Sequence, residues 1–165
     1  MAETRSIGLK SIKMGAIDAA GGMGTILTAL GVTYRGTGSF TVEDATRQEF
    51  FSEENNFTAE ETIISEPGLT QLKFAVINLE PAALQRVFGG TVTGDKWSAP
   101  RDIFEVEQSV EVVTSYNVKI EIPRAKISAR INWNLSRTEI AQVEVTAVVL
   151  TPTLITAAPY SIEQV

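Results

Sequence analysis

The chain contains neither cysteine nor histidine among its 165 residues. Without cysteine it can hold no disulfide, no catalytic thiol and no zinc site built on thiolates. Without histidine it lacks the commonest general base, the commonest transition-metal ligand and the side chain that titrates near neutral pH. A Ser-His-Asp triad is excluded. We therefore predict that the protein is not an enzyme and that it uses no metal or cofactor.

Basic residues are also scarce, since 14 lysines and arginines stand against 20 acids and give a net charge of −6. A nucleic-acid-binding protein normally shows a basic excess or stripe, so specific DNA binding is not expected. Residues 1–5 do not begin a signal peptide, and the apolar stretch 24–32 is too short and too rich in glycine to span a membrane. Synthesis in the cytoplasm is the default expectation.

The length and the 44% hydrophobic content fit a single domain with its own core. Period-2 alternation dominates the second half and predicts a mainly-β antiparallel fold, either a β-sandwich or an open barrel. Strands are expected at 7–17, 69–78 and 142–150, and 151–165 is expected to be an extended arm. The cleanest alternation predicts that six residues point into the core together: Ala125, Ile127, Ala129, Ile131, Trp133 and Leu135.

One short helix is predicted over residues 81–88. Pro81 suits the first helical position, where its missing N–H has no partner to lose. Leu84, Val87 and Phe88 recur at helical spacing, which predicts one apolar face. The two glycines that follow can end the helix in a left-handed conformation.

Residues 43–66 concentrate negative charge, because eight acids and one base give this segment a net charge of −7. The segment is either a solvated loop or hairpin, or a contact arm. Its phenylalanines should be buried either by a neighbouring subunit or by the fold of the segment itself, because exposed aromatic rings on a loop lower solubility. A basic N-terminal strand could supply the opposite charge. The candidates for this contact are Arg5, Lys10, Lys13, Glu49, Phe50, Phe51, Glu53, Glu54 and Phe57.

Other motifs carry no specific chemistry. The pairs Glu53-Glu54 and Glu60-Glu61 lie in a polar segment, whereas a catalytic carboxylate pair needs burial to separate its pKa values. The glycines at 21–24 lack the ending of a phosphate-binding loop. Trp133 falls on an apolar strand face and is predicted to be core, whereas Trp97 is predicted to lie in a more open loop.

Several segments resemble the tail tube proteins of long-tailed bacteriophages. These are residues 61–68 (an acidic strand and a Pro-Gly turn), 72–78 (an apolar strand), 81–92 (a short helix, two glycines and a strand) and 122–152 (the C-terminal strands). Together they cover about half of the chain. They are patterns without a single diagnostic residue.

The resemblance implies a small β-sandwich or barrel that closes into rings of six subunits, and rings that stack into a tube in the virion tail. DNA and the tape measure protein pass through such a tube without specific binding, and other tail proteins are further partners. A conduit of this kind should have a smooth, polar and on balance acidic lumen. Our lumen-lining candidates are Glu105, Glu107 and Glu111, which share one strand face.

Alternatives stay open at this point. The three glutamates could instead pair across strands with Lys126 and Arg130, as in an ordinary sheet. The protein could be another tail or neck component, such as a terminator. It could also be a carbohydrate-binding or adhesion β-sandwich, for which Trp97, Tyr34 and Tyr116 are the candidate exposed aromatics.

Overall fold

A computed structural model of the chain describes residues 5–78 and 80–165. It is a mainly antiparallel β structure with one short helix, which confirms the predicted fold class. In chain order the elements are β1 (Ser11–Gly15), β2 (Thr28–Ala29), β3 (Ser39–Val42), β4 (Thr46–Phe50), β5 (Glu61–Glu66), β6 (Thr70–Val76), α1 (Pro81–Phe88), β7 (Thr91–Thr93), β8 (Lys96–Ser98), β9 (Val106–Val113), β10 (Val118–Asn132), β11 (Gln142–Val149) and β12 (Ser161–Gln164).

The main sheet has eight strands in the order β2-β1-β9-β10-β11-β6-β3, with β12 paired to β10 beside this path. It curls into an open barrel instead of splitting into the two layers of a sandwich. Closure comes from the segment that follows β2. Thr28 and Ala29 pair with β1, while Tyr34 donates its backbone N–H to Ala75 and Ile77 donates to Val32. The seam is therefore joined at one end and stays open between β1 and β3.

The core fills the interior of this curled sheet. Five strand residues are almost completely buried: Met14 of β1, Val110 of β9, Ile122 of β10, and Val145 and Ala147 of β11. Phe74 and Val76 of β6 join the same cluster. Because successive side chains of a strand point to opposite faces, each core strand leaves a second face outside the barrel.

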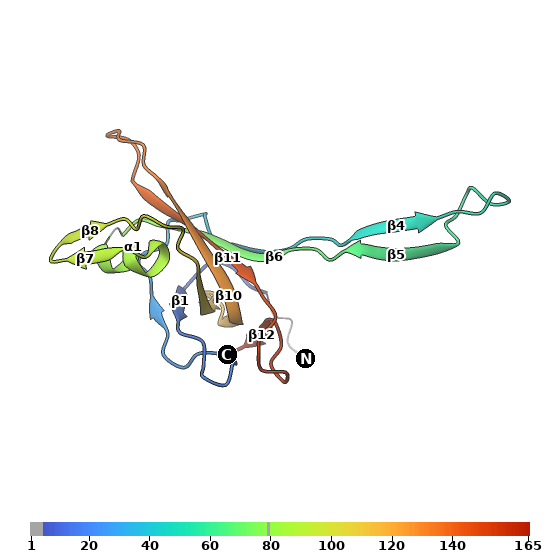
Figure 1. The fold of residues 1–165 in the computed structure, drawn as a ribbon, viewed down its shortest axis with the longest axis horizontal. Coiled ribbons are helices and arrows are strands. Elements are labelled where there is room, and N and C mark those ends of the chain that lie inside the picture. Colours follow the sequence, from blue (N-terminus) through green and yellow to red (C-terminus); the bar gives the residue numbers. More distant parts are fainter. Residues whose placement is uncertain (1–4, 79) are drawn as a thin grey trace.

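Helix α1 covers one end of the barrel. It has the predicted bounds, with Pro81 in its first turn and Gly89 at a φ of 72° after its last residue. Ala83, Leu84 and Val87 face the core, and Phe88 is partly buried against it, so the predicted apolar face is confirmed. The hairpin β7–β8 lies beside the helix (Figure 1), and its Trp97 donates from Nε1 to the carbonyl of Gly89 at 2.8 Å.

Arg86 joins the helix to the closing seam. Its guanidinium donates to the backbone carbonyls of Met14 at 2.7 Å, Ala29 at 3.1 Å and Thr28 at 3.4 Å. Burial lowers the pKa of Arg86. The side chain thus holds the end of β1, the strand β2 and the helix in one arrangement.

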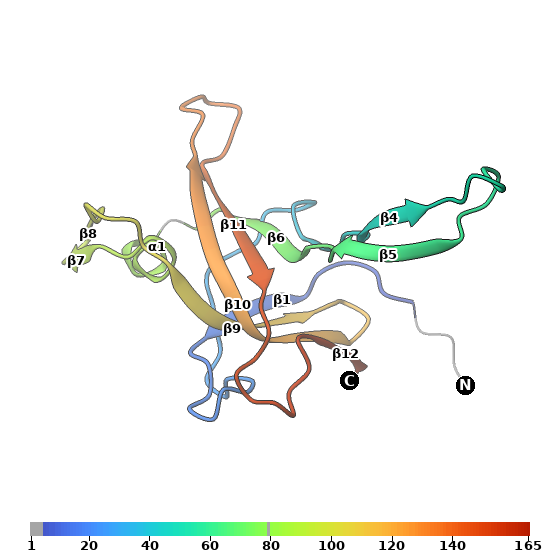
Figure 2. The same cartoon turned by 45° about the vertical axis from the view of Figure 1, so that its right-hand side comes forward.

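Two hairpins leave the barrel. The antiparallel pair β4–β5 forms a sheet of its own and projects far from the rest of the molecule (Figure 1). Every residue of both strands is exposed, and none contributes to the core cluster. The second projection is the far end of β10 with the start of β11, which Figure 2 shows as a separate finger.

Several sequence predictions need correction. The first strand begins at Ser11, so residues 7–10 are outside it. Ala125 and Ile127 are core and Ala129 is half-buried, but Ile131, Trp133 and Leu135 are exposed because β10 runs past the barrel into the second finger. The predicted C-terminal arm instead returns to the sheet, where Ser161–Gln164 pair with Val118–Glu121 of β10.

Candidate assembly surfaces

The tip of the β4–β5 hairpin is held by its own hydrogen bonds. Ser52 Oγ lies 3.1 Å from Glu60 Oε1 and accepts the backbone N–H of Asn55 at 3.2 Å. Asn55 also accepts the N–H of Phe57 and donates to Thr58 Oγ1 at 3.0 Å. The tip therefore presents its side chains from a defined loop, which lowers the entropy lost when a partner binds.

Apolar and acidic side chains lie together on this hairpin. Phe57 is 95% exposed at the tip, and Phe50 and Phe51 are about half exposed beside it. Ile63 and Ile64 of β5 are also exposed. The structure thus brings six of the predicted contact residues onto one projection: Glu49, Phe50, Phe51, Glu53, Glu54 and Phe57. An isolated two-stranded hairpin is only marginally stable in water. Contact with another surface that buries these side chains would therefore stabilise the hairpin.

The predicted basic partners lie on the barrel and not on the hairpin. Lys13 is on the outer face of β1, with its Cα opposite those of Glu111 and Ala29. Lys10 precedes β1 and donates its backbone N–H to Val113. Among the described residues, neither lysine forms an ion pair with the acidic hairpin. Arg5 is exposed near the start of the described chain.

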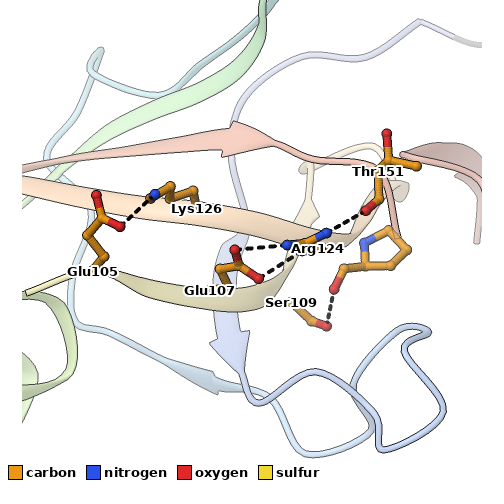
Figure 3. Close-up of polar contacts among 7 residues, drawn as sticks. Glu105, Glu107, Ser109, Arg124, Lys126 and Thr151 are labelled. Carbon is orange, nitrogen blue, oxygen red and sulfur yellow. Dashed lines mark hydrogen bonds and ion pairs between the residues drawn. The ribbon is translucent and has the colours of Figure 1, made fainter. Parts of the chain in front are cut away.

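The three lumen candidates lie on the outer face of β9 or just before it, and two of them are paired (Figure 3). Glu105 Oε2 is 2.7 Å from Lys126 Nζ. Glu107 accepts two bonds from Arg124, at 2.8 and 3.0 Å, and Arg124 also donates to the carbonyl of Thr151. Glu111 lies between Lys13 and Glu121 in the sheet register.

Cross-strand pairing is therefore the local role of Glu105 and Glu107 in the single chain. The predicted partner Lys126 is confirmed for Glu105, whereas Arg130 instead pairs with Glu144 of β11. When Glu105, which lies just before β9, is counted with them, the outer faces of β1, β6, β9, β10, β11 and β12 carry equal numbers of bases and acids. The bases are Lys13, Lys73, Lys119, Arg124, Lys126 and Arg130, and the acids are Glu105, Glu107, Glu111, Glu121, Glu144 and Glu163.

These pairs shift the titration of their members. The hydrogen bond from Arg124 lowers the pKa of Glu107, and the hydrogen bonds from Asn132 and Arg130 lower that of Glu144. Hydrogen bonds to Glu163 and Glu121 raise the pKa of Lys119, which fastens β12 to β10.

The lowered pKa of Glu107 predicts an acid-dependent loss of stability. Because folding lowers this pKa, the carboxylate stabilises the fold above the ordinary glutamate range and loses that effect as pH falls through the folded pKa. We expect Glu107→Gln to lower the stability at pH 7 by only about 0.5 kcal/mol, since the side chain is partly exposed and water screens the pair. The difference from wild type should shrink as pH falls below the ordinary glutamate range.

Thermal unfolding between pH 3 and pH 8 checks this expectation. Asp95→Asn, in the exposed turn between β7 and β8, is the matched control, and its difference from wild type should not follow the same pH course. A Glu107→Gln variant whose unfolding temperature stays parallel to that of wild type across the whole range would show that the pair with Arg124 contributes nothing.

The open seam of the barrel leads into a cavity of about 860 Å³. Its floor is apolar and includes Ile12, Phe40, Leu72 and Val112. Among the described residues, the lining contains two bases, Lys10 and Arg35, and no acid. Sequence reasoning identified Lys10 but missed Arg35 and the cavity, because nothing local in the sequence shows that β1 and β3 stay apart.

The candidate carbohydrate platform is not assembled. Trp97 packs on Phe88 with ring centroids 5.8 Å apart and is half-buried, contrary to the prediction of an open position. Trp133, predicted to be core, is 47% exposed on the second finger. Tyr34 and Tyr116 are exposed, but Tyr34 lies beside the seam and Tyr116 lies in the β9–β10 turn.

Within residues 5–78 and 80–165, no helix has the length and apolar character to cross a membrane. Within the same residues, no group of three or more acidic side chains is placed to hold a metal ion. In comparisons with known proteins, no family model and no curated sequence matches the chain.

Proposed function

We propose that this protein is a structural subunit that assembles with copies of itself into stacked rings, forming a tube like that of a phage tail. The observation that carries the proposal is the β4–β5 hairpin. It holds three phenylalanines and a strong negative charge outside the core, on an arm that has no folding role in the single chain.

Exposed strand edges give further support. Strand β10 continues beyond the start of β9, which pairs with it only as far as Ile127, so one edge of the finger is unpaired. Unpaired edges invite pairing with another chain unless they are blunted or covered. Apolar side chains line the same finger, namely Ile131, Trp133, Leu135 and Ile140. Lateral closure of copies into a ring would cover both features.

The charge-balanced outer face fits a conduit for DNA. On this surface bases are already paired with acids, as Arg124 is with Glu107 and Lys126 with Glu105. Such paired bases bind phosphates weakly, so little counterion release would favour DNA binding. This differs in detail from the acidic lumen expected from the sequence, but it serves the same end, passage without binding. The tape measure protein would occupy the same channel, and the assembled product would reside in the virion tail.

Negative-stain electron microscopy of the purified full-length protein tests the proposal. Rings, or tubes built of rings, are expected as the concentration rises, and sedimentation velocity should show species far larger than 17.9 kDa. A protein that stays monomeric across the range, at both low and high salt and with purified tail proteins added, would overturn it.

A further inference from the structure

We infer that the cavity at the barrel seam receives the tip of the β4–β5 hairpin from a second copy of this chain. This inference rests on the proposed self-assembly and adds the receiving surface. Three observations support the hairpin tip as the occupant: its charge is opposite to that of the cavity, its size fits the cavity, and the root of the hairpin keeps the tip away from the cavity of its own chain.

The cavity is built for an apolar, negatively charged segment. Its floor is formed by barrel residues such as Ile12, Leu72 and Ile120. Of the residues that the structure describes, Lys10 and Arg35 are the only charged ones in its lining. In the described part of the chain, neither base forms an ion pair. A rim of one charge sign raises the local concentration of an oppositely charged partner and sets its orientation.

A small polar ligand fits this cavity poorly. Such sites present a few polar groups that converge on the ligand. Among the described residues, the one buried side-chain atom without a hydrogen-bond partner is Oε1 of Gln108, which is not part of the lining. The cavity is therefore complementary to an occupant that is apolar where it contacts the floor and negatively charged where it contacts the rim.

The hairpin tip offers this combination. Phe57 and Phe51 supply exposed rings, and Glu53 and Glu54 supply carboxylates in the same loop. The hydrogen bonds around Ser52 and Asn55 fix the loop before it docks. A volume of about 860 Å³ accommodates such a tip with more than one aromatic ring.

The occupant must come from another copy. The hairpin leaves the rim of its own cavity at β3, whose Ser39 and Phe40 belong to the lining. Its root is fixed, because the N–H of Glu43 donates to Leu69 at 2.9 Å and a Cβ on Gly68 would lie 1.8 Å from the Glu43 carbonyl oxygen. The β4–β5 ladder then carries the tip away from the barrel in both views (Figures 1 and 2).

Each copy carries the hairpin tip at one end of the arm and the cavity near the root of the arm. Docking of the tip of one copy in the cavity of the next is therefore a head-to-tail contact. Contacts of this kind propagate from copy to copy unless they close. The cavity thereby gives the stacking of subunits a direction, with Lys10 and Arg35 facing the acidic tip of the preceding copy.

Disulfide cross-linking tests the docking directly, because the natural chain has no cysteine. Asn56→Cys places a thiol beside Phe57 at the tip, and Ser39→Cys places one at the cavity rim. The two full-length variants, each with a different tag, are mixed and oxidised under assembly conditions. We expect the mixed dimer joined through these two positions to be the main product by mass spectrometry.

The matched control replaces Ser39→Cys with Asp95→Cys, which is exposed in the β7–β8 turn away from the cavity lining. If assemblies form but residue 56 cross-links as readily to residue 95 as to residue 39, the cavity is not the receptor and only this inference is overturned. If no assembly forms, both the inference and the proposed function fail. A discrete pair of copies cross-linked at 39 and 56 would support the cavity and contradict the tube.

Charge exchange gives a second test with a rescue. The double variant Lys10→Glu, Arg35→Glu should lose assembly, because its rim repels the tip. Adding Glu53→Lys and Glu54→Lys to the same chain should restore most of it, as sedimentation velocity would show. Unchanged assembly in the first variant, or no recovery in the second while circular dichroism confirms folding, would contradict the docking.

Discussion

Excision of the β4–β5 hairpin should leave a folded monomer that no longer assembles. Residues 47–65 can be replaced by Asn-Gly, because Thr46 and Glu66 are register partners and this dipeptide favours the tight turn that joins such a pair. The core cluster contains no residue of the hairpin, so the unfolding temperature should change by only a few degrees. Electron microscopy should show neither rings nor tubes, and sedimentation velocity should show monomers.

Point variants then separate the two components of the contact. Phe51→Ser with Phe57→Ser removes the exposed rings, and Glu53→Gln with Glu54→Gln removes two charges at constant shape. If charge dominates, the glutamine variant and raised salt should weaken assembly alike, since salt screens exposed charges. If the rings dominate, the serine variant should be the weaker assembler. An excision variant that still polymerises normally would return the hairpin to the role of a solvated projection.

The fold was predictable where local chemistry decides it. Pro81 and the apolar spacing of Leu84 and Val87 defined α1 to its observed bounds. Alternation correctly assigned Ala125 and Ile127 to the core. Alternation reports which face of a strand is apolar, but not where the strand leaves the barrel. Trp133 was assigned to the face of Ile127, but β10 ends at Asn132 and the tryptophan is exposed on the finger beyond the strand.

The ion pairs were only partly predictable, because a bulge changes the register. Ile122 lies opposite Val110 and Ala125 lies opposite Gln108, so β10 has one more residue than β9 in this interval. Such a bulge re-aims side chains, and here Arg124 contacts Glu107. Arg130 lies beyond the start of β9 and pairs with β11 instead. A sequence without known register cannot show either result.

The candidate contact arm was visible in the sequence, and the cavity proposed to receive it was not. Composition alone separates 43–66 from the rest of the chain, because net charge needs no knowledge of neighbours. The cavity depends on residues as far apart as Leu9, Phe40 and Ile120, which the closing of the barrel brings together. Arg86 was missed for the same reason, since its three acceptors lie 57 to 72 residues away in the chain.

Arg86→Met is expected to cause the largest loss of stability among single substitutions outside the core. Methionine keeps an unbranched apolar stem but donates no hydrogen bond, so the carbonyls of Met14, Ala29 and Thr28 lose their common donor. The Met14 bond is partly buried and the other two are exposed. A buried acceptor left without a partner costs about 1–3 kcal/mol, and bonds to a charged donor are the stronger kind.

We therefore expect a loss of roughly 2–3 kcal/mol, which for a chain of this size lowers the unfolding temperature by about 5–10 °C. Arg101→Met is the matched control, because Arg101 is exposed before β9 and should change stability by less than about 0.5 kcal/mol. Hydrogen exchange adds a local readout: amides of β1 and β2 should lose protection first, while those of β10 and β11 keep theirs. Equal unfolding temperatures for the two variants would show that Arg86 does not hold the seam, and that the barrel closes through the pairing of Thr28 and Ala29 with β1 alone.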